Sequence, residues 1–147
     1  MPISAITDSP PDQPEEQLRL FIETMEKWES ESWKAMKAAE RTASPKSYEE
    51  AARQLLVSIF QKFCTPKKRT YGRVDNLSLA QPSDYCSQNL VLAARESSPR
   101  RAVFVATSAR RGWASKWVFV LLKQGGRWLV DNKKGISDDG SESSWWL

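Results

Sequence analysis

The stretch that decides the fold runs from Arg101 to Lys134 and reads RAVFVATSARRGWASKWVFVLLKQGGRWLVDNKK. Its middle part, Trp117 to Leu122, is apolar throughout. A short run of aromatic and β-branched residues is typical of a strand with apolar neighbours on both faces. Gly125-Gly126 can supply the two positive φ angles of a tight turn. Together with Ala102–Thr107 before it and Arg127–Asp131 after it, this run predicts three consecutive antiparallel strands.

Two amphipathic helices are predicted upstream of these strands. Apolar residues recur every three or four positions from Leu18 to Ala39, which predicts a helix from Glu15 to about Arg41, with Asp12 as a candidate cap. A second helix is predicted from Tyr48 to Phe63, with Ser47 and Glu50 as a capping box and Pro66 ending it. Neither helix can bury its apolar stripe alone, so both should pack on the sheet.

The order of elements predicts an α+β fold. Gln88–Glu96 is predicted to form one more strand. The chain after Lys134 has no regular pattern, and it ends with the apolar Trp145-Trp146-Leu147, which we expect to pack on the rest of the domain. Strands 102–107 and 117–122 are apolar on both faces, and helices cover only one face. The outer face must therefore meet the middle segment, the Trp-rich end or another protein.

Length and composition indicate one domain. The chain has 147 residues, of which 40% are hydrophobic and 27% charged, as in globular proteins. Residues 1–14 are proline-rich and lack periodicity, so we expect a disordered tail followed by a single domain over 15–147. No apolar run approaches the roughly 20 residues of a membrane span, and no signal peptide is evident. These features favour a cytoplasmic protein without a membrane partner.

The residues that usually carry catalysis are scarce. The chain has no histidine, and Cys64 and Cys86 lack metal or redox spacing, so we expect two reduced packing residues and neither metal, cofactor nor catalytic residue. Asp131 is the one carboxylate inside an apolar strand. Buried, it could act as a general base, but a bond to a nearby lysine or backbone amide is the simpler interpretation.

Charge divides the chain into an acidic front and a basic rear. The net charge is −3 over residues 1–64 and +7 over residues 65–147, which together give +4. Basic pairs such as Arg100-Arg101 and Lys133-Lys134, with Tyr71 for stacking, raise the hypothesis of a nucleic-acid-binding module. The charge is spread over several loops and no recognised binding motif appears, so no nucleic acid is expected as a partner.

The ensemble of motifs resembles the nuclear transport factor 2 fold immunity proteins, which protect bacteria against polymorphic toxins and type VI effectors. The segments that carry the resemblance are Glu16–Phe21 with Trp28, Trp33–Ala39, Phe63–Arg69, Tyr71-Gly72-Arg73, Phe119–Lys123, Gly126, Trp128–Asp131, Lys133-Lys134 and Trp146-Leu147. The resemblance implies a cone in which N-terminal helices pack on a curved antiparallel sheet. It also implies an antitoxin that is not an enzyme and neutralises a cognate cytosol-acting toxin, such as a nuclease, through a protein–protein interface.

Exposed aromatic and charged loop residues are the candidate contacts for such a partner. They are Arg110, Arg111 and Trp113 in one strand–strand loop, Asp138, Asp139 and Glu142 in an acidic loop, and Tyr71 and Arg73 after the basic segment. The alternative is a small pocket enzyme of the same fold, isomerase-like or dehydratase-like, which a pocket lined by at least two ionisable groups would favour. The sequence leaves open whether the outer sheet face forms a homodimer.

Overall fold

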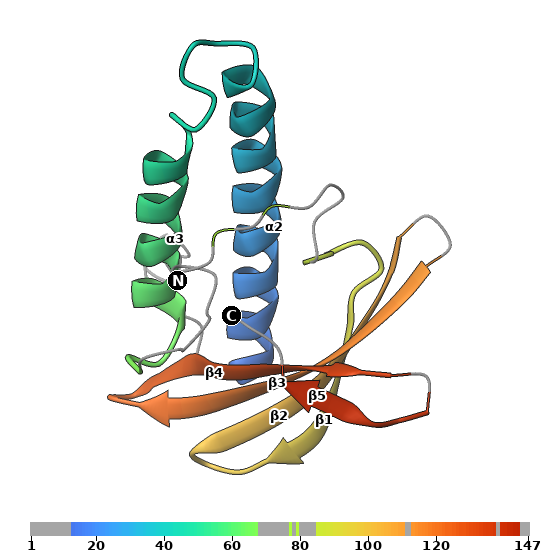
Figure 1. Cartoon of the computed structure of the whole chain (residues 1–147). Helices are drawn as coiled ribbons and strands as arrows, with labels where there is room; N and C mark the ends of the chain where they lie inside the picture. The colour runs from blue at the N-terminus through green and yellow to red at the C-terminus, as the bar shows by residue number, and fades with distance from the viewer. Residues whose placement is uncertain are drawn as a thin grey trace, which may run out of the picture.

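The computed structural model describes residues 13–67, 77, 79, 85–110, 113–137 and 139–144. Its helices are α2 (Pro14–Ala39) and α3 (Glu49–Phe63), and its strands are β1 (Val91–Ser97), β2 (Arg101–Arg110), β3 (Trp113–Gln124), β4 (Arg127–Ile136) and β5 (Glu142–Ser144). Within these residues the strands form one five-stranded antiparallel sheet in the order β1-β2-β3-β4-β5. Figure 1 shows α2 and α3 side by side, standing on one face of this sheet. The predicted α+β fold is confirmed.

The helices form where the apolar spacing predicts them, but their caps differ from expectation. Helix α2 begins at Pro14 after the N-cap Gln13, and α3 begins at Glu49 after the N-cap Tyr48; neither cap donates or accepts a side-chain hydrogen bond. The predicted capping box at Ser47 is therefore wrong, because one extra turn of chain precedes the helix. Glutamates in both first turns still complement the helix dipole.

The helices are joined to each other by a buried hydrogen bond. Trp28 Nε1 of α2 donates to the carbonyl of Ala52 in α3 over 2.9 Å. The guanidinium of Arg127 in β4 donates to the last-turn carbonyl of Lys62 over 2.6 Å and so caps α3 against the sheet. Among the described helices, none has a long enough apolar stretch to cross a membrane.

The predicted hairpin after β3 is confirmed. Gly125 and Gly126 have φ angles of 58° and 76°, as a two-residue primed turn requires. Strand β3 pairs with β2 from Trp113 to Leu122 and with β4 from Trp117 to Gln124. The stretch from Arg101 to Lys134 is thus the centre of the sheet.

Two bulges interrupt the regular pairing of the sheet. In β1, Ala94 pairs with Phe104 and Glu96 with Val103, which leaves Arg95 as the extra residue. In β4, Val130 and Asn132 pair with consecutive residues of β3, which leaves Asp131 as the extra residue. A bulge redirects the side chain it carries, and both of these side chains make ion pairs with residues far away in sequence.

The apolar side chains form a main core and a smaller one on opposite faces of the sheet. The main core lies between the helices and the inner face and holds the buried residues Leu18, Phe21, Ile22, Met25, Trp28, Ala52, Leu56, Phe63, Cys64, Tyr85, Ala102, Phe104, Ala106, Phe119, Leu121, Trp128 and Val130. The smaller core on the outer face consists of Val103, Val118 and Val120. These valines of the outer face are buried within a single chain, without a second protein. A homodimer through this face stays a prediction.

The C-terminal part departs from expectation. Residues Glu142–Ser144 form β5, which pairs with Ile136, Gly135 and Lys134, so the region read as a loosened end adds a strand to the sheet. The predicted strand over 88–96 is confirmed as β1 with a start at Val91. The expected packing of Trp145-Trp146-Leu147 and the tail up to Asp12 lie outside the described residues.

Candidate functional site

Most of the predicted partner contacts that the structure describes gather at one end of the sheet. Arg110 ends β2 and pairs with Trp113, the first residue of β3. The β4–β5 connection, with Asp139 and Glu142, lies at this same end, since β4 ends at Ile136 opposite the start of β3. Figure 1 shows both hairpins leaving this end of the sheet. We call it the hairpin end. Arg111, Asp138, Tyr71 and Arg73 lie outside the described residues.

The acidic hairpin is held in a defined shape. The Asp139 carboxylate accepts hydrogen bonds from Ser141, 2.9 Å from its backbone nitrogen and 2.7 Å from its hydroxyl, and Gly140 between them has a φ of 85°. These bonds lower the pKa of Asp139 because they stabilise its charged form. The bonds from Ser141 therefore hold the Asp139 carboxylate in one position.

Glu142 joins the two edges of the sheet. Its carboxylate accepts hydrogen bonds of 3.0 and 3.4 Å from the guanidinium of Arg95, the bulge residue of β1. Because β1 and β5 are opposite edge strands, this pair requires the sheet to curl until side chains of its two edges reach each other. Figure 1 shows the curled sheet. The bond from Arg95 lowers the pKa of Glu142.

Replacing Glu142 with glutamine should destabilise the protein in a pH-dependent way. The pKa of Glu142 in the folded protein lies below its ordinary value of 4.5. Its contribution to stability is therefore present above that value and is lost as the pH falls through the folded-state pKa. We expect Glu142→Gln to have a slightly lower Tm than wild type at pH 7, as measured by circular dichroism. The difference in Tm should shrink as the pH falls below 4.5. About 1 M NaCl should also narrow this difference. A difference of constant size across pH would contradict this ion pair.

Asp131 forms the predicted bond to a nearby lysine, which is the structural role and not the catalytic one. Its carboxylate accepts a 2.8 Å hydrogen bond from the Thr65 hydroxyl and lies 3.3 Å from Nζ of Lys67. The Thr65 backbone also donates to the carbonyl of Val130 over 2.9 Å. Asp131 therefore fastens the segment after α3 to β4. The bond to a nearby lysine is confirmed, although the strand continues beyond Asp131 to Ile136.

Removing this fastening should cost measurable stability. Asp131→Ala loses the hydrogen bond from Thr65 and the ion pair with the half-exposed Lys67, and we expect a loss of about 1–2 kcal/mol in the free energy of unfolding. Asp131→Asn keeps an acceptor for Thr65 and should lose less. Urea denaturation of both variants measures this loss. An Asp131→Ala variant with the wild-type free energy of unfolding would refute the expectation.

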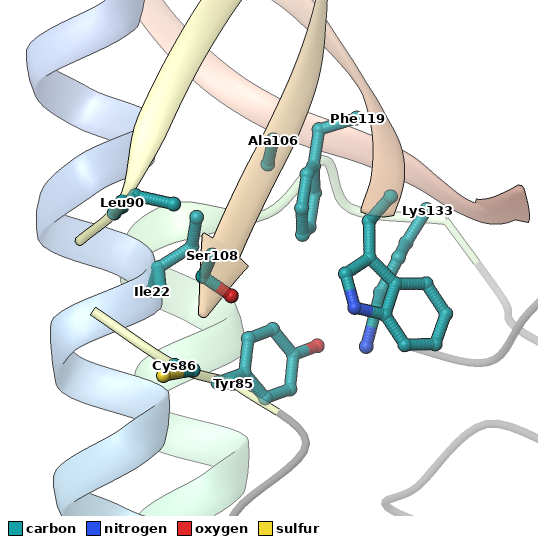
Figure 2. Close-up of a pocket in the computed structure, with 9 residues that line it drawn as sticks. Ile22, Tyr85, Cys86, Leu90, Ala106, Ser108, Phe119 and Lys133 are labelled. Carbon is teal, nitrogen blue, oxygen red and sulfur yellow. The ribbon is translucent and has the colours of Figure 1, made fainter. Parts of the chain in front are cut away.

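A small pocket lies on the inner face of the sheet, beside α2 (Figure 2). Its lining comes from α2, the segment before β1, and strands β2, β3 and β4, and comprises Ile22, Tyr85, Cys86, Leu90, Ala106, Ser108, Trp117, Phe119 and Lys133. Its volume is about 10 Å³, room for about one water molecule. Glu26 of α2 accepts hydrogen bonds from the backbone and the hydroxyl of Ser87 and so holds the segment of Tyr85 and Cys86 in place.

Lys133 is the pocket residue that the sequence did not reveal. Its side chain is 1% exposed. Regular alternation after Val130 would place Asn132 on the inner face, but the bulge at Asp131 places Lys133 there, opposite Phe119. No local sequence signal marks this bulge, so the lysine reads as half of a solvent-exposed basic pair. Cys64 and Cys86 form no disulfide, as expected, and both are fully buried although the sequence suggested half-buried residues.

Comparison with known proteins shows the family to which the chain belongs. The sequence model described as NTF2 fold immunity protein matches residues 13–145. The chain belongs to this family. It is also similar to Immunity protein RhsIA of Dickeya dadantii (strain 3937), with 29% identity over 123 residues, which cover 84% of this chain and 87% of the relative. No solved structure matches the chain with comparable significance. This NTF2 fold immunity protein therefore has an NTF2-like α+β fold, and its family supports an immunity role.

Proposed function

We propose that the protein neutralises a cognate bacterial toxin by binding it in the cytosol. The observation that carries this proposal is the match of residues 13–145 to a family of immunity proteins. The chemistry of neutralisation needs only a preformed surface with anchoring side chains and complementary charge. The hairpin end offers such a surface, since its acidic hairpin is fixed by the Asp139–Ser141 bonds and the Arg95–Glu142 pair.

The charges of the candidate contacts suggest which kind of toxin the chain would attract. A cationic nuclease would be attracted by Asp138, Asp139 and the glutamates of α2, whereas an acidic toxin would be attracted by Arg110 and Arg111. We propose a nuclease as the partner, because the basic surface by which a nuclease holds nucleic acid would be attracted by the carboxylates of Asp139 and of α2.

Co-expression tests the proposal directly. The toxin encoded beside the gene for this protein is expressed in a host cell with and without the chain. We expect growth arrest with the toxin alone and restored growth with the chain, together with a stable complex in size-exclusion chromatography. Growth arrest that persists despite soluble expression of the chain would refute a neutralising role. Loss of nucleic-acid cleavage by the purified toxin on addition of the chain would identify a nuclease.

The pocket provides the one observation that favours an enzyme. Three ionisable side chains, those of Tyr85, Cys86 and Lys133, line it. However, its volume of about 10 Å³ leaves no room for a metabolite beside these side chains. Turnover of a small carbonyl or hydroxy compound by the purified chain, abolished in Lys133→Met, is the result that would support the enzyme over the binding protein.

A further inference from the structure

The ammonium group of Lys133 lies between two aromatic rings. Nζ is 4.0 Å from the centroid of the Tyr85 ring and 4.1 Å from that of the Trp117 ring. Both distances are well inside the roughly 6 Å within which a ring attracts a cation. Figure 2 shows the side chain pointing from β4 into the pocket toward Tyr85. Aromatic rings around an ammonium group are also the arrangement by which proteins bind quaternary ammonium ligands.

The rings are positioned by the fold and not by the lysine alone. Tyr85 is 2% exposed and packs edge-on against Phe21 of α2, with 5.7 Å between the ring centroids and 89° between the planes. Trp117 belongs to the central strand β3, two residues before the buried Phe119. The cage therefore consists of side chains whose places are set by α2 and the sheet.

Other lysines beside aromatic rings lack this arrangement. Lys123 lies 5.8 Å from the Trp128 ring and Lys37 lies 4.6 Å from the Trp33 ring, and both lysines are exposed. Lys133 differs because it is buried and has a ring on either side. The lysine side chain, and not solvent, fills the pocket, since only about 10 Å³ remains.

We propose that this pocket is a binding site for a small primary alkylammonium ion, and that the chain occupies it with its own Lys133. The aromatic rings recognise the charge, and Phe119 and Ala106 line the pocket alongside the methylene chain. In the wild-type protein the site is closed to free ligands of this class. Shortening Lys133 to alanine removes three methylene groups and the ammonium group, and n-propylammonium has this composition. The inference does not depend on the toxin.

The test measures the Tm of Lys133→Ala with increasing n-propylammonium. We expect this variant to melt below wild type, and its Tm to rise by about 4 °C when the ligand reaches roughly ten times its Kd. The neutral isostere 1-propanol should give no comparable rise, because it lacks the charge that the rings attract. Wild type should not respond, because its site is filled. The matched control Lys123→Ala, which loses an exposed lysine above one ring, should not respond either.

Equal responses to n-propylammonium and 1-propanol, or a response of the same size in wild type and in Lys123→Ala, would overturn the proposal. A proton NMR measurement on the wild-type protein tests it without a variant that must fold. The methylene protons beside Nζ of Lys133 should be shifted upfield by the two ring faces, away from the position shared by the exposed lysines. Resonances at the ordinary lysine position would overturn the proposal as well.

Discussion

Phe21→Ala is expected to destabilise the protein by about 3–5 kcal/mol. Phe21 is fully buried in α2 and contacts two aromatic rings, with centroids 5.8 Å away in Phe63 and 5.7 Å away in Tyr85. Truncation leaves a cavity where α2, α3 and the segment before β1 meet, and these elements cannot collapse into it together. Since about 1 kcal/mol shifts the Tm of a chain of this size by some 2–4 °C or slightly more, a fall of roughly 10 °C or more should appear in a thermal melt.

The neighbouring position provides a matched control. Leu20 precedes Phe21 in the same helix and is 39% exposed. Leu20→Ala removes apolar atoms from the same turn without opening a closed cavity. It should lower the free energy of unfolding by less than about 1 kcal/mol. A loss of similar size in both variants would mean that helix propensity, and not packing against Phe63 and Tyr85, sets the stability. Such a result would contradict the arrangement of the core.

The second large effect concerns binding at the hairpin end. If the proposed interface is correct, the combined variant Arg110→Ala, Arg111→Ala and Trp113→Ala should weaken toxin binding at least 100-fold, equivalent to about 2.7 kcal/mol. Arginine and tryptophan dominate the energy of protein interfaces through packing and hydrogen bonds as well as through charge, so removing three such side chains from one loop should weaken binding even to a cationic toxin. Isothermal titration calorimetry with the purified toxin measures the Kd, and growth rescue should fail in parallel.

The opposite end of the sheet supplies the control for this variant. Arg100 and Arg101 lie where β1 connects to β2, away from the hairpin end, and both are exposed. Arg100→Ala with Arg101→Ala removes the same number of positive charges, so an effect of net charge alone would change the Kd equally in both variants. We expect the Kd of this control to stay within about threefold of wild type. Equal weakening would place the toxin elsewhere on the surface.

The parts of the fold that local chemistry determines were predictable from the sequence. The turn at Gly125-Gly126 and the pairing around it follow from residues adjacent in the chain, as does the register of the apolar stripe of α2. The parts that depend on a bulge were not predictable. The contacts of Arg95 with Glu142, and of Lys133 with its two rings, depend on one extra residue in β1 and one in β4. Such insertions change neither composition nor local propensity.

The candidate site was likewise predictable only in part from the sequence. Clustering of Arg110, Trp113, Asp139 and Glu142 at one end of the sheet follows from the hairpin order, which the sequence indicates through its turns. Strand β5 itself was missed, because Glu142–Ser144 is short and polar and pairs only with the end of β4. Its place is set by the turn before it, where Ser137 and Ser141 share a backbone hydrogen bond and Ser141 donates to Asp139.

The extra residue in β4 has a consequence for comparing this chain with others of similar shape. In a chain with the same spacing but regular pairing in place of the bulge, the asparagine at position 132 would point inward and the lysine at position 133 outward. The amine would then face water. When chains of similar shape are compared, the pairing of this strand and not its residue types alone therefore decides whether a charged group reaches the interior.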